Sequence, residues 1–261
     1  MNRGFSFLKK IRHVVKAITS HLRMLKTLLS IILLFLLTET SFGQFGPSNL
    51  GIAINAVYTT SAQIYLNPNA SNIEIRNKSF TLENIWNPGL DVRYRFSEEF
   101  ILGLNLEYIN RSESAPNLSA FIGNQVVVLE VDDGLRLIPI ELTFYYYFPF
   151  STEDFKFMMG GGLGYYRGEF IRKFSGVELE VVQRKLAVGI HVSASMDYMI
   201  NQNISARFEM KFRDPQYNVK SKYSKTELTF QGNTVQLPDD AFETKVDIDG
   251  LTFILGFVIN L

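Results

Sequence analysis

The chain has 261 residues, with 26 Lys and Arg against 26 Asp and Glu, so its formal net charge at pH 7 is zero. A neutral chain lacks the basic surface on which nucleic-acid binders depend, so nucleic acid is not an expected partner. The hydrophobic fraction of 46% excludes an intrinsically disordered chain, and the length allows one large domain or two small ones. Because the chain has no Cys, it can form neither disulfides nor a thiolate site.

The N-terminal segment has the pattern of a secretory signal peptide. Seven basic residues precede an apolar run from Leu28 to Leu37, which is shorter than the ~20 residues of a transmembrane helix. Small residues follow the run, and we predict cleavage near Gly43. The chain is therefore divided into a signal peptide at 1–43 and an exported domain at 44–261. Met24 is an alternative start, and a retained N-terminal anchor is the alternative to cleavage.

Removal of the signal peptide changes the charge balance. It takes seven basic residues and one acidic residue from the 26 of each sign, which leaves 19 basic and 25 acidic residues and a net charge of −6. Two of the three histidines leave with it. His191 is then the only histidine of the exported domain.

From Leu50 onward, apolar residues recur at every second position, which is typical of strands with one apolar face. In residues 90–96, four apolar residues alternate with Asp91, Arg93 and Arg95, so one face is entirely apolar and the other entirely charged. Eight segments show this alternation: 50–59, 90–96, 100–109, 135–148, 155–167, 185–200, 204–213 and 249–261.

The connections between these segments alternate in length. Three are short (97–99, 149–154 and 201–203) and four are long (60–87, 110–134, 168–184 and 214–248). Tight turns at one end and long loops at the other are the layout of an outer-membrane β-barrel, and a closed barrel pairs its whole backbone inside a bilayer. We therefore predict an all-β fold, an eight-stranded antiparallel transmembrane up-and-down β-barrel with four surface loops.

Pro139 does not fit a regular strand, because its missing N–H would interrupt the ladder. One interpretation is a β-bulge near the outer rim. The other is that the membrane strand begins only at Ile140, with residues 135–138 belonging to the loop.

Two segments carry a resemblance to a known family: the glycine-rich run at 159–166 and the final strand at 251–261. Residues 51–261 resemble the small outer-membrane barrels of the OmpA, OmpX and OmpW kind, the outer-membrane protein β-barrel domain family. Such barrels usually end in an aromatic residue, whereas this chain ends in Leu261 with Phe257 upstream. The resemblance implies a monomeric integral protein of a Gram-negative outer membrane. Its expected partners are outer-membrane lipid, lipopolysaccharide and the barrel-assembly machinery.

The polar faces of the predicted strands supply a set of charges that would face the lumen. Eight strands enclose only enough room for side chains, so we predict that these charges pair with one another and fill the barrel. The alternative is a narrow polar pore or proton path lined by the same residues. The predicted lumen set comprises Asp91, Arg93, Arg95, Glu107, Glu141, Lys156, Lys185, Asp197, Arg207, Glu209, Lys211 and Arg213.

An enzymatic hypothesis depends on His191 and Ser193. Their His-x-Ser spacing resembles that of the lipid A deacylases of the PagL kind, and it places both side chains on one strand face. That motif continues with Asn, whereas Ala194 follows here, and the pattern directs His191 inward and away from acyl chains. The alternative is a lumen histidine hydrogen-bonded to Ser193 or Asp197.

Function is expected to depend on the loops, since loops on rigid scaffolds carry binding sites. Residues 228–235 predict a β-hairpin around Gly232 and Asn233. We expect an integral outer-membrane barrel with a structural, surface-binding or minor permeation role, without catalysis, cofactor or metal. The alternatives are an OmpW-like conduit for small hydrophobic solutes and a PagL-like lipid A deacylase.

Overall fold

The computed structural model describes residues 49–122, 125–230, 232–237 and 239–261. The predicted signal peptide at 1–43 and the alternative start at Met24 lie outside these ranges. Within them, no helix combines the length and the apolar character that a membrane span requires.

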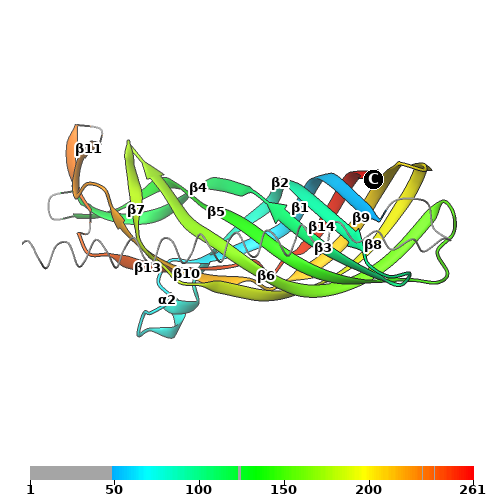
Figure 1. Cartoon of the computed structure of the whole chain (residues 1–261). Helices are drawn as coiled ribbons and strands as arrows, with labels where there is room; N and C mark the ends of the chain where they lie inside the picture. Colours follow the sequence, from blue (N-terminus) through cyan, green and yellow to red (C-terminus); the bar gives the residue numbers. More distant parts are fainter. Residues whose placement is uncertain (1–48, 123–124, 231, 238) are drawn as a thin grey trace, which may run out of the picture. The chain divides into compact units, whose positions relative to one another are not determined.

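The described residues are mostly strand, as expected for an all-β fold (Figure 1). The one helix, α2, is a single short turn at Ile73–Asn77, between the first two strands. Fourteen strands are found in the described part of the chain: β1 (Leu50–Tyr65), β2 (Ser79–Arg95), β3 (Phe100–Glu107), β4 (Ile109–Ile122), β5 (Gln125–Tyr147), β6 (Phe155–Phe174), β7 (Val177–Arg184), β8 (Ala187–Asn201), β9 (Ile204–Arg213), β10 (Gln216–Tyr223), β11 (Glu227–Phe230), β12 (Asn233–Gln236), β13 (Phe242–Asp247) and β14 (Leu251–Asn260).

Some of these strands form a closed antiparallel ring. β1 pairs with β2, and the ladder continues through β3, β5, β6, β8, β9 and β14. β14 then pairs back onto β1, from Gly51↔Asn260 to Thr59↔Thr252. Such a closed ring leaves no unpaired edge, which is the condition for a sheet inside a bilayer. Each of the eight predicted strand segments falls largely within one strand of this ring.

The four predicted long loops are wrong as loops, because most of their residues are strand. β1 and β2 continue beyond the ring through residues 60–65 and 79–88. Residues 110–134 form β4 and the first part of β5, residues 168–184 complete β6 and form β7, and residues 214–248 contain β10 to β13. The strands therefore extend well past the ring to form a second sheet region, which we call the extension.

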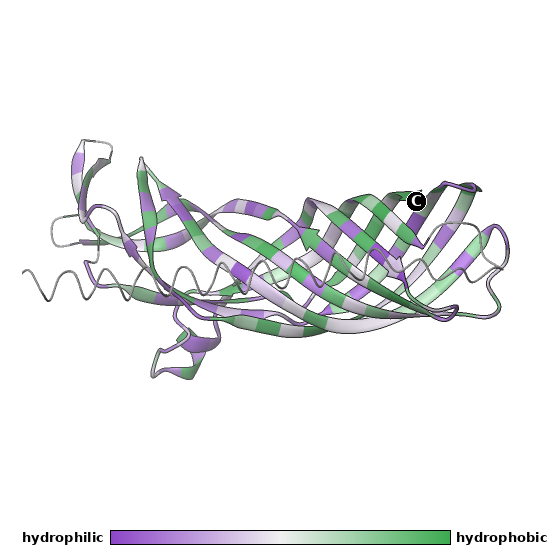
Figure 2. Cartoon of the chain, viewed as in Figure 1, coloured by the Kyte–Doolittle hydropathy of each residue, from purple (hydrophilic) through white to green (hydrophobic). Residues whose placement is uncertain are grey.

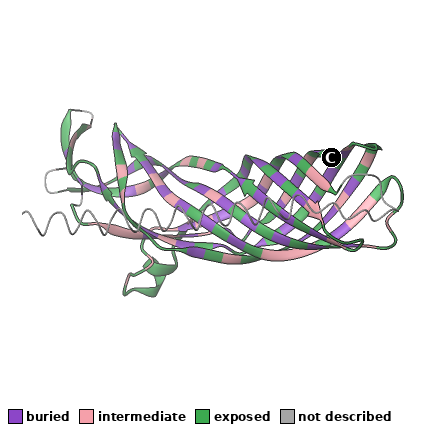
Figure 3. Ribbon diagram, in the orientation of Figure 1, coloured by how far each residue is buried: buried purple, intermediate pink, exposed green. Residues whose placement is uncertain are grey.

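The alternation inverts where the ring passes into the extension, and this explains the error. In the ring the outward face is apolar and the inward face is charged, whereas in the extension the inward face is apolar and the outward face polar (Figures 2 and 3). Ala62 and Ile64 of β1, for example, are fully buried, while Gln63 and Tyr65 point outward. The sequence interpretation followed outward apolar residues and stopped where they ended.

The interior of the extension is an apolar core. One cluster lies next to the ring and includes Leu82, Ile85, Leu135, Leu137, Phe170 and Ile248, all at most 2% exposed. A second cluster includes Leu118, Val131, Phe174 and Val235. The predicted hairpin is confirmed as β11 and β12, with Gly232 at φ +79°, and its Val235 lies in the second cluster.

Both interpretations of Pro139 are wrong. β5 runs without interruption through this residue, and its register with β6 continues from Ile138↔Arg167 through Pro139↔Tyr166 to Ile140↔Tyr165. On its other edge, β5 changes partner at this point, pairing with β3 up to Ile140 and with β4 from Leu137. The missing N–H falls at this change of partner, where the ladder is already interrupted.

The glycine run of β6 provides a test of close packing in the ring. A Cβ added to Gly162 would lie 1.9 Å from the carbonyl oxygen of Leu142, whereas one added to Gly161 would lie 3.4 Å from its nearest neighbour. We expect Gly162→Ala to destabilise the barrel by ~1–3 kcal/mol through overpacking and Gly161→Ala to be tolerated. Urea unfolding of both variants in detergent measures this, and equal stability would contradict the packing argument.

Candidate functional site

The strands of the ring direct a dense set of charged side chains into the lumen. Inward and outward positions alternate along each strand, so residues two apart on β2, β8 and β9 point to the same interior. Nine members of the predicted lumen set are buried there: Asp91, Arg93, Glu107, Glu141, Asp197, Arg207, Glu209, Lys211 and Arg213. Their contacts divide them into two layers along the barrel.

The layer nearer the short turns is organised by two arginines. Arg207 makes a bidentate contact with Asp197, with both N–O distances 2.7 Å, and also contacts Asp91. Arg93 donates to Asp91 at 2.9 Å, contacts Glu209, and lies 3.9 Å above the centre of the Tyr145 ring. Two guanidinium groups are therefore shared among three carboxylates, and residues from four strands, β2, β5, β8 and β9, are linked.

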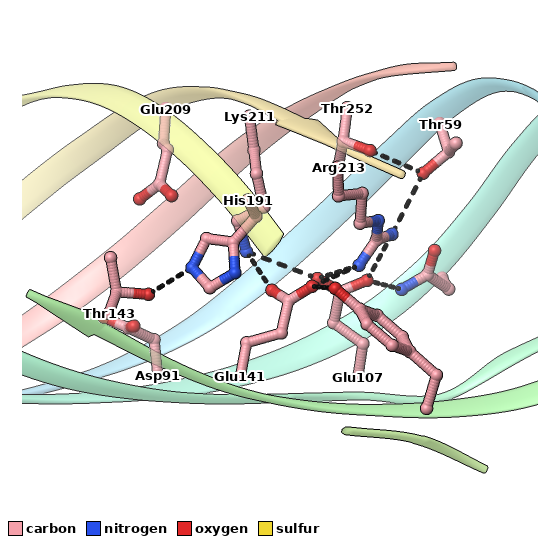
Figure 4. Close-up of polar contacts among 12 residues, drawn as sticks. Thr59, Asp91, Glu107, Glu141, Thr143, His191, Glu209, Lys211, Arg213 and Thr252 are labelled. Atoms are coloured by element: carbon pink, nitrogen blue, oxygen red, sulfur yellow. Dashed lines mark hydrogen bonds and ion pairs between the residues drawn. The ribbon is translucent and has the colours of Figure 1, made fainter. Parts of the chain in front are cut away.

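The second layer, nearer the extension, is shown in Figure 4. Lys211 Nζ lies 2.7 Å from Glu141 Oε2, and Arg213 makes a bidentate contact with Glu107 at 3.0 and 3.1 Å. Arg213 also donates to Glu141 at 3.3 Å, and the Tyr166 hydroxyl donates to Glu141 at 2.9 Å. Two cations and two carboxylates thus balance across the lumen with side chains less than 2% exposed.

The enzymatic hypothesis meets an unsuitable geometry. His191 is 2% exposed, and its Nε2 lies 2.7 Å from Thr143 Oγ1 of β5. Neither Ser193 nor Asp197 is its hydrogen-bond partner, so that part of the sequence interpretation is wrong. Ser193 Oγ and His191 Nδ1 have no hydrogen-bond partner among the described residues. His191 and Ser193 do not form a nucleophile–base pair in this conformation.

Three predicted lumen residues do not belong to the buried ion-pair network, and each for a positional reason. Arg95 is at the end of β2, where it donates to the backbone of Ser97 and stacks on Tyr147 at 4.6 Å. Lys156 is only half-buried, at the start of β6, and makes no ion pair among the described residues. Lys185 lies between β7 and β8, exposed on the outside, with its Nζ 2.6 Å from Glu243.

The sequence interpretation also missed neutral residues that complete the network. Tyr145 receives a hydrogen bond from Arg93 at 2.9 Å, and Asn87 donates to Glu107 at 3.3 Å. Tyr145 lies on the same strand face as Glu141, so the period of two could have found it. Tyr166 has the same parity as Gly162 and Gly164 on β6, so the period of two could have found it as well.

This arrangement is suited to closing the lumen rather than to holding a ligand. Each of the five carboxylates contacts at least one guanidinium or ammonium group. Among the residues that the structure describes, no group of three His, Asp or Glu side chains is placed to hold a metal ion. A buried carboxylate that is already neutralised by a fixed cation is a poor metal ligand, since the cation would have to leave.

A separate ion pair is buried inside the extension. Arg172 makes a bidentate contact with Asp133, with both N–O distances 2.7 Å, and donates to the Tyr223 hydroxyl at 3.0 Å. Asn117 donates to the same carboxylate at 3.1 Å. The pair links β4, β5, β6 and β10.

Among the described residues, the first part of β2 and the neighbouring β4 form no backbone ladder, and we call this boundary the seam. Residues 79–88 of β2 pair with β1, and β4 lies on their other side without a ladder to them. One backbone hydrogen bond crosses at this point, from Tyr108 N, between β3 and β4, to Pro88 O at 3.2 Å. An apolar pocket of about 330 Å³ opens at this point, lined by Ile54, Pro88, Leu90, Leu106, Tyr108 and Ile138 among others. Leu82, Ile85 and Ile109 of the apolar core lie behind the seam.

Comparison with known proteins gives a likeness in structure alone. No family model matches the chain, and no curated protein sequence matches it. The outer membrane protein OprG of Pseudomonas aeruginosa superposes with a TM-score of 0.58 at 16% identity, covering 83% of this chain and 97% of OprG. The chain has the fold of a small outer-membrane β-barrel.

Other solved barrels align less well. Neisserial surface protein A gives a TM-score of 0.44 at 12% identity over 82% of this chain and 98% of that protein. Outer membrane protein W of E. coli gives 0.39 at 15% identity over 84% and 100%. The prediction of an antiparallel barrel is confirmed, and the likeness to OprG extends to its fold alone.

Truncation of a lumen carboxylate tests the buried network. Glu141→Ala leaves Lys211 without its 2.7 Å partner and Arg213 with one carboxylate, so we expect a loss of ~3–5 kcal/mol in unfolding free energy. Urea unfolding in lipid vesicles, followed by Trp86 fluorescence, measures it. The matched control is Glu178→Ala, whose exposed pair with Lys173 contributes at most ~1 kcal/mol. Equal losses for the two variants would show that the lumen is hydrated.

Glu243 on the outside of the extension predicts a pH dependence. Hydrogen bonds from Lys185, Asn218 and Asn69 lower the pKa of its carboxyl group to about 2. The folded-state pKa lies below the unfolded value of ~4.3, so the stabilisation is present above pH ~4.3 and is lost as pH falls toward 2. We expect the segment around Asn69 to gain hydrogen exchange over this range, after correction for intrinsic rates. Glu243→Gln should abolish the pH-dependent part, and its persistence in that variant would exclude Glu243 as the cause.

Proposed function

We propose that the protein is an integral outer-membrane β-barrel, closed to water, that holds a rigid sheet extension at the cell surface in a structural or surface-binding role. The observation that carries the proposal is the pair of ion-pair layers across the lumen. Charged groups from β2, β3, β5, β8 and β9 meet there with side chains no more than 9% exposed. A lumen filled in this way presents no continuous path for hydrated ions.

The outward face of the ring supports the membrane location. Ile54, Leu163 and Ile190 are 61–69% exposed, and large apolar side chains continue around the ring at this level. Patches of this extent are unfavourable in water and suit the lipid tails of a bilayer. At the short-turn end, aromatic rings follow one another from Phe96, just after β2, past β3, β5 and β6 to β8, with centroid distances such as 5.0 Å for Phe100 and Phe144. Such rings favour the headgroup region.

Several parts of this proposal rest on sequence patterns. Export through a signal peptide places the barrel beyond the inner membrane, and eight ring strands agree with the small barrels that enclose only side chains. The geometry of His191 counts against a His191–Ser193 catalytic pair, and the absence of catalysis stays a prediction. The expected partners, lipopolysaccharide and the barrel-assembly machinery, stay predictions. The monomeric state also stays a prediction.

Conductance in planar bilayers tests the closed lumen. We expect the wild-type protein to insert without producing current steps, because the ion pairs fill the lumen. The double variant Glu141→Ser with Lys211→Ser removes one pair without leaving a lone charge from it, and we expect it to admit water and show small steps. Glu178→Ser with Lys173→Ser, at the exposed pair of the extension, is the control and should stay silent. Current steps from the wild type would overturn the proposal.

A second candidate is a conduit for small hydrophobic solutes, and the seam between β2 and β4 favours it. The seam joins the apolar interior of the extension to the outer apolar pocket of about 330 Å³, and only side chains and one backbone bond close it there. A solute that left through the seam would avoid the charged layers of the ring.

Disulfide cross-linking separates the two candidates, because the chain has no native Cys. Pro88→Cys with Tyr108→Cys would fasten the seam where one backbone bond already joins it. A conduit predicts that oxidation slows transfer of an apolar dye into vesicles and that reduction restores it. The control pair Leu90→Cys with Leu106→Cys lies on the intact β2–β3 ladder. If dye transfer is equal for both pairs, or absent from the wild type, the conduit is excluded.

A further inference from the structure

The outward apolar residues of the ring form a belt around the barrel. The residues at the edge of this belt nearest the extension differ from strand to strand. This edge is the level at which outward side chains stop being apolar on the way from the ring to the extension. On β5 the outward series passes from Ile138 to Arg136, and on β6 it passes from Tyr165 to Arg167. Just before β8, Lys185 adjoins the exposed Leu186.

The other strands of the ring end the belt differently. Beyond Phe212 of β9 comes the exposed Asp214, and before Leu251 of β14 comes the exposed Asp249. The belt ends in Thr60 on β1, Asn84 on β2 and Asn110 at the start of β4. Because β5, β6 and β8 are consecutive in the ring, the edge has one contiguous basic side, and the next two strands carry acids.

Two cations of the basic side, Arg136 and Arg184, share one carboxylate. Glu169 lies directly opposite Arg136 in the β5–β6 register, and the two side chains are 3.5 Å apart. Arg184, at the end of β7, contacts the other oxygen of Glu169, and Arg167 lies two residues before Glu169 on the same outward face. The guanidinium side chains of Arg136 and Arg184 stay 44% and 38% exposed, so they retain free donors.

The charge balance of this side is positive. Its four cations are Arg136, Arg167, Arg184 and Lys185, and its two carboxylates are Glu169 and Glu243. Two positive charges therefore remain unneutralised. A hollow of about 100 Å³ is lined by Arg136 and Glu169 together with Lys173 and Glu178, among others. It lies where β6 and β7 have separated, since their ladder comprises only Lys173↔Glu178 and Phe174↔Val177.

We propose that Arg136, Arg167, Arg184 and Lys185, the basic sector, bind the phosphate groups of a lipid headgroup. Exposed guanidinium groups present paired donors that match phosphate oxygens, and their position at the membrane surface adds long-range attraction. The lipid's acyl chains lie against the outward apolar residues directly below, such as Ile140, Leu163 and Val188. Asp214, just after β9, and Asp249, just before β14, repel the same headgroup, so binding is confined to one side. This inference rests on the proposed membrane location.

Lipid retention by the full-length protein provides the test. The barrel is reconstituted into phosphatidylcholine vesicles containing bisphosphorylated lipid A or its dephosphorylated form, and the bound glycolipid is counted by native mass spectrometry after gentle extraction. We expect about tenfold more retention of the phosphorylated form. The triple variant Arg136→Gln, Arg167→Gln, Arg184→Gln should lose that preference. Each substitution is outward and exposed, and gel mobility before and after heating verifies that the variant is folded.

The matched control removes three other outward cations of the extension, by Lys220→Gln, Lys222→Gln and Lys245→Gln. It should keep the preference, and an equal loss in the control would replace a defined sector by general charge attraction. Equal retention of the two lipids by the wild type would overturn the inference while leaving the closed barrel intact. Displacement by inorganic phosphate at low millimolar concentration would assign the sector to free phosphate and also overturn it. Failure of the wild-type protein to insert into vesicles would instead overturn the proposed function.

Discussion

The structure depends on charge compensation inside a closed ring. Once β14 pairs back onto β1, inward side chains lose contact with bulk water, and an unpaired charge there would be strongly unfavourable. Arg213 illustrates the solution, since its fully buried guanidinium is shared between Glu107 and Glu141. Each strand must keep its register for such contacts to form, so the ion pairs and the backbone ladder stabilise the same arrangement.

A second constraint is the change of solvent along the barrel. In the ring, lipid outside and charge inside give an apolar outward face. In the extension, water lies outside and the interior is filled by residues such as Leu135 and Phe170, so the same strands carry apolar residues inward. β5 and β6 pass through both environments without a break. The level at which the apolar residues of β5 and β6 change from the outward to the inward face marks the membrane surface. The basic sector lies at this level.

At the seam between β2 and β4, the backbone ladder of the wall is interrupted and apolar packing takes its place. β3 ends at Glu107 and β4 begins at Ile109, so the chain changes partner within one step, and Pro139 of β5 lies opposite this point. Apolar packing of Leu82, Ile85 and Ile109 closes the wall where hydrogen bonds do not. Packing is less directional than a ladder, which is why this part of the wall is a candidate route for apolar solutes.

The sequence by itself determined the antiparallel barrel, because a period of two with one apolar face persists through segments such as 90–96 and 204–213. It also placed the nine buried charges on inward faces, since face is fixed by parity along a strand. Parity cannot say which charges meet across the lumen. Lys211 and Glu141, for example, are 70 residues apart, and only the closure of the ring and the stagger of its strands bring them together. The tertiary structure alone decided those pairs, the partner of His191, and the outside position of Lys185. It also revealed the extension, because its inward apolar residues pack only when distant strands are brought together.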